Sequence, residues 1–143
     1  MPATDVIEVL GGQKVLRGKI SNPMELHEKT RMGLPYAAFD AVRSTLQLTR
    51  EEAARAIGVP ERTLARRKKE KKLNALESDR LLRLARVGAL AVEILGKEDN
   101  ASQWLKRANY ALGSRTPLDL LDTDAGAKGV EDVLWQIAYG IVS

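Results

Sequence analysis

The sequence predicts an all-α protein. Alanine and leucine are plentiful while aromatic residues make up only 4% of the chain, a balance that favours helices over sheets. Apolar residues recur at helical spacing in most segments, and no segment shows the alternation of a strand. The chain has 143 residues, 44% hydrophobic and 29% charged, which is ordinary for a globular protein with one core or two small domains sharing one.

Residues 1–22 are expected to form a partly ordered lead-in. Their weak apolar pattern is broken by Gly11 and Gly12, which fits a short helix or an irregular stretch that could contact a second copy. The segment lacks the charged start and long apolar core of a secretory signal. No apolar run is long enough to span a membrane, and the absence of cysteine suits a reducing compartment, so we expect a cytoplasmic protein.

Helix punctuation becomes clear at Asn22. This residue can cap a helix with Pro23 at its first position and Glu25 in its first turn, and Gly33 ends that helix. Pro35 then starts a second helix. Its apolar residues share one face at helical spacing: Tyr36, Phe39, Val42 and Leu46.

The next passage predicts a helix-turn-helix unit. Thr49 and Glu52 have the spacing of a capping box, and the short helix behind them ends at Gly58, where a positive φ has no steric cost. Pro60 opens a second helix that Leu64 would hold against the first. A short helix, a tight turn containing glycine and another helix are the parts of this motif. We place the domain that contains it at residues 23–77.

The second helix of this unit runs into "RTLARRKKEKK", residues 62–72, with seven basic residues and one acid. If Leu64 faces the core, Arg62, Arg66 and Lys69 lie on the opposite face, with Thr63 at its flank. A recognition helix reads base edges near its N-terminus and meets phosphates further along. These four residues are the candidate DNA contacts, although a solvated surface helix would carry the same charges.

One position departs from the usual pattern of the motif. Three residues after Leu64 an apolar side chain is expected, and here Arg67 stands there. We predict that Arg67 buries its stem and pairs with an acid, for which Glu77 is the candidate. Arg67 would then be structural rather than a DNA contact.

Residues 78–143 are expected to form a second, smaller helical domain, begun by a long central helix over 78–95 that is apolar on more than one stripe. Asn100 and Gln103 should cap a further helix that stops at Gly113, and Pro117 should start a short helical turn. The last helix is predicted over 125–139, with Gly140 at its end. Its predicted buried residues are Val130, Val133, Leu134 and Ile137.

Charge is strongly polarised along the chain. Residues 61–86 carry ten bases and four acids, whereas residues 87–143 carry five bases and eight acids. A basic middle and an acidic end favour two partners of opposite charge. An enzyme is not indicated: the single histidine, the absence of cysteine and the lack of a GK[ST] phosphate loop leave no catalytic, metal or cofactor site.

The C-terminal part contains several separated motifs in a fixed order: 111–113 (ALG), Pro117, the leucine pair 120–121, Thr123, Gly126 and the apolar run that ends at Gly140. With these motifs it resembles the toxin-binding domain of the Xre/MbcA/ParS-type antitoxins. Upstream, "ELHEKTRMGLP", "RTLARRK" and "ESDRLLRLARVGALA" are similar to the same family's helix-turn-helix domain. The match extends from about Pro23 to Ser143.

This resemblance implies an antitoxin that holds a RES-domain, NAD-consuming toxin inactive and represses the shared promoter. In such a protein the C-terminal end approaches the NAD cleft of the toxin, which implies contacts from Tyr139, Gly140, Ile141, Val142 and Ser143. We hypothesise that the terminal carboxylate satisfies basic groups meant for the NAD phosphates. Arg115 could lie near the same surface, and Trp135 falls off the buried face of the last helix, as an interface anchor would.

Operator DNA is normally read by two-fold dimers, so a homodimer within a larger toxin complex is expected. Two other functions stay open at this point. One is a transcription regulator with a helical dimerisation domain and no toxin. The other is a helical adaptor whose basic helix is only a solvated surface.

Overall fold

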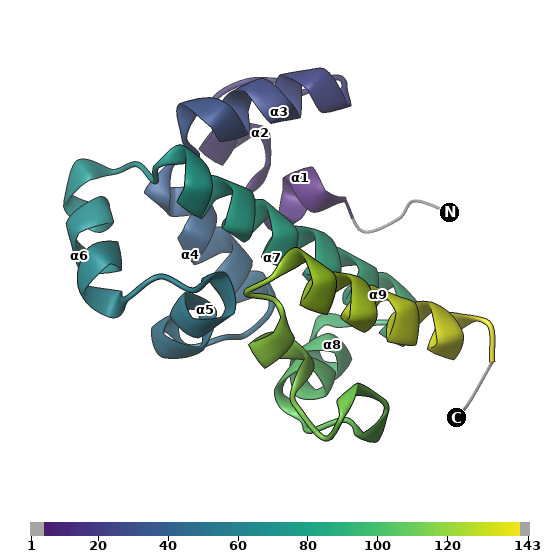
Figure 1. Cartoon of the computed structure of the whole chain (residues 1–143). Coiled ribbons are helices and arrows are strands. Elements are labelled where there is room, and N and C mark those ends of the chain that lie inside the picture. The colour runs from purple at the N-terminus through teal and green to yellow at the C-terminus, as the bar shows by residue number, and fades with distance from the viewer. Residues whose placement is uncertain (1–4, 141–143) are drawn as a thin grey trace.

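The computed structural model describes residues 5–140, and every regular element in that range is helical (Figure 1). The predicted all-α fold is therefore confirmed. In chain order the elements are α1 (Val6–Val9), α2 (Gly12–Leu16), α3 (Pro23–Met32), α4 (Tyr36–Thr45), α5 (Arg50–Ile57), α6 (Glu61–Glu70), α7 (Ala75–Leu95), α8 (Glu98–Lys106), the 3-10 turns η1 (Tyr110–Leu112) and η2 (Pro117–Leu120), and α9 (Asp124–Ala138).

Helix α7 runs through the middle of the molecule (Figure 1). It contacts α1, α3, α4 and α5, which precede it in the sequence, and α8 and α9, which follow it. It can do so because its apolar residues cover more than one stripe, and Leu81, Leu84 and Val87 are all fully buried. The helix begins at Ala75, three residues before the predicted start. Asn74 and Glu77 cap it reciprocally, and this capping box was missed in the sequence.

A glycine in α7 lets α4 approach closely. A Cβ placed on Gly88 would lie 2.5 Å from Leu46 Cδ1, and Leu46 is fully buried. Gly88 is therefore needed for packing rather than for a turn, since its position is inside a regular helix.

The N-terminal lead-in folds into α1 and α2 and joins the core. Val9, Leu10 and Leu16 are all nearly inaccessible to solvent, and α1 contacts both α4 and α7. These three side chains are buried within one chain and are not available for contact with a second copy.

The loop between α3 and α4 pairs with the loop between α6 and α7. Leu73 N donates to Leu34 O at 2.9 Å, Tyr36 N donates to Lys71 O at 3.1 Å, and the buried Ser78 hydroxyl accepts from Leu34 N at 2.7 Å. This pairing places the start of α4 beside the end of α6. Within residues 5–140 such pairing stops at isolated bridges, and no strand forms.

Element boundaries in the C-terminal half differ from the prediction. Helix α8 begins at Glu98, so Asn100 is inside it and its amide donates to Leu95 O at 2.9 Å instead of capping a new helix. The helix ends at Lys106 rather than at Gly113, and the 3-10 turn η1 fills the interval. The short turn after Pro117 is confirmed as η2.

The last helix, α9, is shifted by one residue from the prediction because Thr123 caps it by accepting from Gly126 N at 3.0 Å. Val130 and Leu134 are fully buried against the core. Ile137, predicted to be buried, is 40% exposed, because α9 extends beyond its neighbours at that end.

Replacing Gly88 by alanine is expected to lower the free energy of unfolding by about 1 kcal/mol or more, because the added Cβ overpacks Leu46. The matched change Gly129→Ala in α9 should raise it by about 0.5–1 kcal/mol, since a Cβ there meets nothing within 4 Å and alanine favours helix. Chemical denaturation measures both. Changes of the same sign would contradict the close approach of α4 and α7.

Candidate functional site

Helices α5 and α6 form the predicted helix-turn-helix unit. Thr49 and Glu52 cap α5 reciprocally at 3.0 and 2.8 Å, and Gly58 ends the helix with φ of 65°, as the turn requires. Leu64 is fully buried and seats α6 on the core. The small residues Ala53, Ala54 and Ala56 are also buried, which lets the two helices approach closely.

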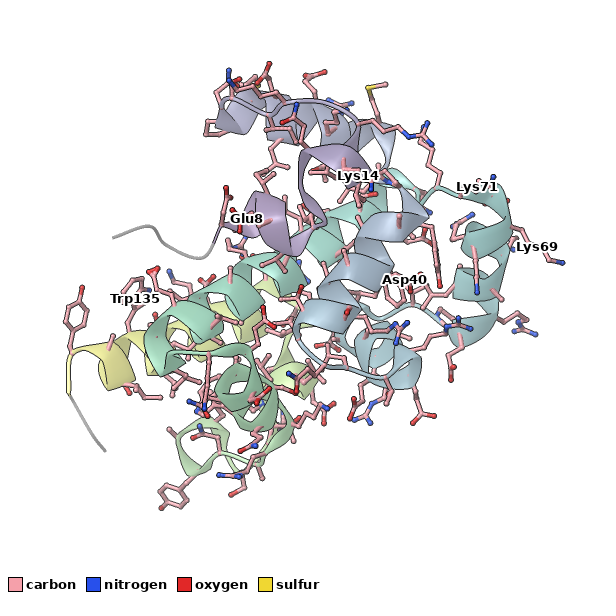
Figure 2. All side chains as sticks on the ribbon, turned by 180° about the vertical axis from the view of Figure 1, so that it is seen from behind. Glu8, Lys14, Asp40, Lys69, Lys71 and Trp135 are labelled. Carbon is pink, nitrogen blue, oxygen red and sulfur yellow. The ribbon has the colours of Figure 1, made fainter. Side chains whose placement is uncertain are left out.

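The outer face of α6 is basic and open to solvent. Arg62, Arg66 and Lys69 are exposed, and Thr63 is half-buried at the flank, as the helical spacing indicated. Among residues 5–140 none of these three bases forms an ion pair with an acid. Figure 2 shows Lys69 pointing away from the body of the protein. Unpaired cations on one helix face are available to an anionic partner.

Arg67 has the structural position that the sequence predicted. Its Nε donates to Glu77 Oε1 at 2.7 Å and its Nη2 to Glu77 Oε2 at 3.0 Å, while Nη1 reaches Glu70 at 3.0 Å. The side chain is 16% exposed, and that of Glu77 8%. The prediction that Arg67 pairs with Glu77 is therefore confirmed, and this bidentate pair fastens α6 to the start of α7.

The pair also sets the protonation of Glu77. Burial raises the pKa of this carboxyl, but hydrogen bonds from Arg67 and from the Asn74 backbone outweigh burial and hold the pKa below its ordinary value. Hydrogen bonding to Glu77 in turn raises the pKa of Arg67 above its ordinary range. Both groups are charged at neutral pH, which keeps the docking of α6 fixed.

Polar contacts join the helix-turn-helix unit to the C-terminal half. Arg55 of α5 pairs with Asp119 of η2, and Lys106 of α8 lies 3.3 Å from Glu52 and donates to Gln47 O at 2.7 Å. The first pair is largely exposed and contributes little by itself. Because η2 also packs on α5, the two halves meet along a continuous surface.

At the far end of α9, two aromatic residues form an exposed pair. Trp135 and Tyr139 are 43% and 73% exposed, and their rings stack with centroids 5.9 Å apart. Gly140 follows with a positive φ, and the remaining candidates Ile141, Val142 and Ser143 lie outside the described residues. A stacked, solvent-facing aromatic pair is the kind of anchor that protein interfaces use.

A cavity of about 310 Å³ adjoins this pair between α1, α7 and α9. Trp135, Leu90 and Val6 line it, and the ion pair between Arg86 and Glu131, at 3.2 Å, lies at its edge. Sequence reasoning identified Trp135 but missed Val6 and Leu90. Nothing in their local patterns indicates that three such distant segments meet.

Arg115 is exposed in the turn between η1 and η2, where its carbonyl accepts from Asn109 N at 3.0 Å. Among residues 5–140 no hydrogen bond joins its side chain to Trp135 or Tyr139. Tyr110 is 92% exposed beside the same turn.

Across residues 5–140 we find no cluster of side chains that could hold a metal ion. In the same range no helix is both long and apolar enough to cross a membrane.

Comparison with known proteins decides the family. Residues 25–86 match the Xre-like helix-turn-helix domain of antitoxins, and residues 90–140 match the Xre/MbcA/ParS C-terminal toxin-binding domain. The chain belongs to the Xre antitoxin family. It is 37% identical over 113 residues to an Antitoxin Xre of Photorhabdus laumondii, covering 78% of this chain and 76% of the relative.

Further similarities agree with this assignment. An Antitoxin Xre of Yersinia enterocolitica is 31% identical over 120 residues, covering 82% of this antitoxin and 81% of the relative. Among solved structures, a chain of the M. tuberculosis MbcT-MbcA toxin-antitoxin complex superposes with a TM-score of 0.59 at 27% identity, covering 76% of this chain and 96% of that one. The aromatic pair therefore lies in a toxin-binding domain, and the basic helix in an Xre-like helix-turn-helix domain.

The substitution Glu77→Gln is expected to lower the free energy of unfolding of this antitoxin by about 2 kcal/mol at neutral pH, because it leaves Arg67 without its buried counter-charge. The pKa of Glu77 is lowered by folding, so its stabilisation is present above the unfolded pKa of about 4.3 and is lost as pH falls through the folded pKa.

Denaturation of wild type and Glu77→Gln at a series of pH values measures this effect. The gap between the two proteins should narrow in acid. A gap that stays constant would show that the charge of Glu77 does not stabilise the fold.

Proposed function

We propose that this antitoxin acts through two separate surfaces: the basic face of α6 binds operator DNA, and the exposed end of α9 binds and inhibits a cognate toxin. The observation that carries the proposal is that these two surfaces lie far apart in the fold. Helix α6 and the end of α9 lie at opposite ends of the molecule (Figure 1), and Lys69 and Trp135 point away from each other in Figure 2.

The DNA half of the proposal rests on charge and geometry. Residues 61–86 have ten bases and four acids, and in the part of the chain that the structure describes α6 displays Arg62, Arg66 and Lys69 without acidic partners. Arginines near the N-terminus of such a helix reach guanine edges, while later lysines neutralise phosphates. We assign operator contacts to these residues and to Thr63, and autoregulation of the operon to this binding.

The toxin half rests on the aromatic pair and its surroundings. Trp135 and Tyr139 expose apolar surface to solvent in the free chain, and a partner could bury this surface. The net negative charge of residues 87–143 suits a basic partner. Tyr139, Gly140 and residues 141–143 form the proposed contact with the toxin, and Arg115 a secondary one. The family resemblance supports a RES-domain toxin that consumes NAD as the partner.

The proposed assembly is a homodimer on DNA, within a larger complex when toxin is bound. Two-fold operators place two recognition helices one turn of DNA apart, which one copy cannot reach. The proposed domain division is a helix-turn-helix domain over 23–77 and a toxin-binding domain over 78–143.

The whole proposal is tested by co-expressing the chain with the adjacent reading frame, purifying the complex and measuring cellular NAD. We expect the neighbour to co-purify, and its expression without this chain to deplete NAD. A chain that binds its promoter but captures no neighbour would instead be a transcription regulator without a toxin.

Replacing Arg62 and Arg66 by alanine is expected to weaken operator binding by about tenfold for each arginine and to reduce selectivity over scrambled DNA, because each can read a base edge. Gel shifts at several salt concentrations measure both effects. Lys97→Ala, the loss of an exposed charge at the start of α8, is the control and should have no effect. Unchanged binding by the double variant would exclude α6 as the recognition helix.

Trp135→Ala and Tyr139→Ala are each expected to weaken toxin binding by about 2 kcal/mol, roughly thirtyfold, because they remove anchors of the interface. DNA binding should be unchanged. Calorimetry with purified toxin measures the affinity, and Met24→Ala, which truncates an equally exposed apolar residue on α3, is the matched control. Deleting residues 141–143 should reduce inhibition; full inhibition at unchanged affinity would remove them from the interface.

A further inference from the structure

A basic cavity lies beside the recognition helix, on a part of the surface that the helix-turn-helix motif does not include. Its volume is about 430 Å³, and it is enclosed by α2, the start of α4 and the end of α6. Its charged and hydrogen-bonding side chains come from three separate segments: Lys14, Arg17, Tyr36, Asp40, Lys68 and Lys71. Figure 2 shows Lys14 and Lys71 on the same face of the protein, with Lys69 near the end of α6.

The fold brings these cations together. The hydrogen bond from Tyr36 N to Lys71 O, at 3.1 Å, fixes the end of α6 to the start of α4, and the buried Leu16 fixes α2 beside them. Lys71 and Arg17 both adopt left-handed backbone conformations, with φ of 64° and 57°. Glycine is the residue that this conformation favours. The chain instead has a cation at both positions, and both line the cavity.

Tyr36 forms part of the cavity wall and is 5% exposed. Its Oη is buried and has no hydrogen-bond partner among the described residues. Burial and then the nearby Asp40 raise the pKa of this phenol, so it stays neutral. The tyrosine therefore adds no negative charge to a cavity lined by four cations, which suits an anionic ligand.

The remaining groups fit the same ligand. Helix α4 starts at the cavity with Pro35 as its N-cap, and its first amide, Tyr36 N, donates to Lys71 O, so no acidic side chain caps this end of the helix. The one acid, Asp40, is drawn toward Arg43, whose Nη2 lies 3.4 Å from Oδ1. Four cations against one paired carboxylate leave a net positive site.

We propose that this cavity binds a backbone phosphate of the DNA that α6 reads, so that the lead-in helix α2 forms part of the DNA interface. The proposal rests on DNA binding by α6. Lys68 is on α6 and Lys71 is its C-cap, on either side of Lys69, so a duplex seated on the outer face of the helix would have its sugar-phosphate backbone beside the cavity. Phosphate contacts of this kind fix register and carry no sequence information.

The test measures duplex binding by the full chain at several salt concentrations, with operator and scrambled sequences. Lys14→Ala and Lys71→Gly, which suits the left-handed backbone, should each weaken binding about fivefold to both sequences and reduce the salt slope by about one. Lys128→Ala, an exposed lysine of α9, is the control and should change neither quantity.

The outcomes separate this inference from the proposed function. Variants that bind both duplexes like wild type overturn the inference alone, provided that Arg62→Ala still loses operator binding. A wild-type chain that binds no duplex overturns both. If calorimetry with inorganic phosphate shows binding that depends on Lys14 while duplex affinity does not, the cavity takes free phosphate and its assignment to DNA is wrong.

Discussion

The carboxylate of Glu77 fixes the geometry on which the rest of this antitoxin depends. It accepts from the Asn74 backbone to start α7, and it accepts twice from Arg67 to dock α6. One buried group therefore sets both the beginning of the central helix and the orientation of the basic helix. A buried carboxylate of this kind allows few alternative positions of the two helices, because losing one of its hydrogen bonds would leave an unsatisfied charge in the interior.

Helix α7 extends that constraint to the C-terminal half. The two family matches meet within it, one ending at residue 86 and the other beginning at residue 90, while the helix itself is continuous from Ala75 to Leu95. Contacts of η2 with α5 and of Lys106 with Glu52 reinforce the junction. The proposed DNA-binding and toxin-binding surfaces are thus joined by one continuous helix, and within residues 75–95 no flexible linker separates them.

Local signals in the sequence were enough to predict the helices, the turn at Gly58 and the pairing of Arg67 with Glu77. Capping residues and glycines determine where a helix begins and ends, and a charge at a position that is normally apolar requires a partner nearby. The end of α8 and the exposure of Ile137 were predicted wrongly, since both depend on where neighbouring helices stop. The cavity at Tyr36 could not be predicted. It needs α2, α4 and α6 to meet, and that contact is a property of the tertiary fold.

The continuity of α7 has a consequence for how the protein can be divided. A cut between residues 77 and 78 would remove Glu77 and the cap from the C-terminal fragment and would leave the N-terminal fragment without Leu81, Leu84 and Val87. Each fragment would expose apolar surface that the other normally covers. The two domains are therefore separate in sequence and in their proposed partners but not in folding, and a protease that cleaves within α7 would disrupt both proposed surfaces together.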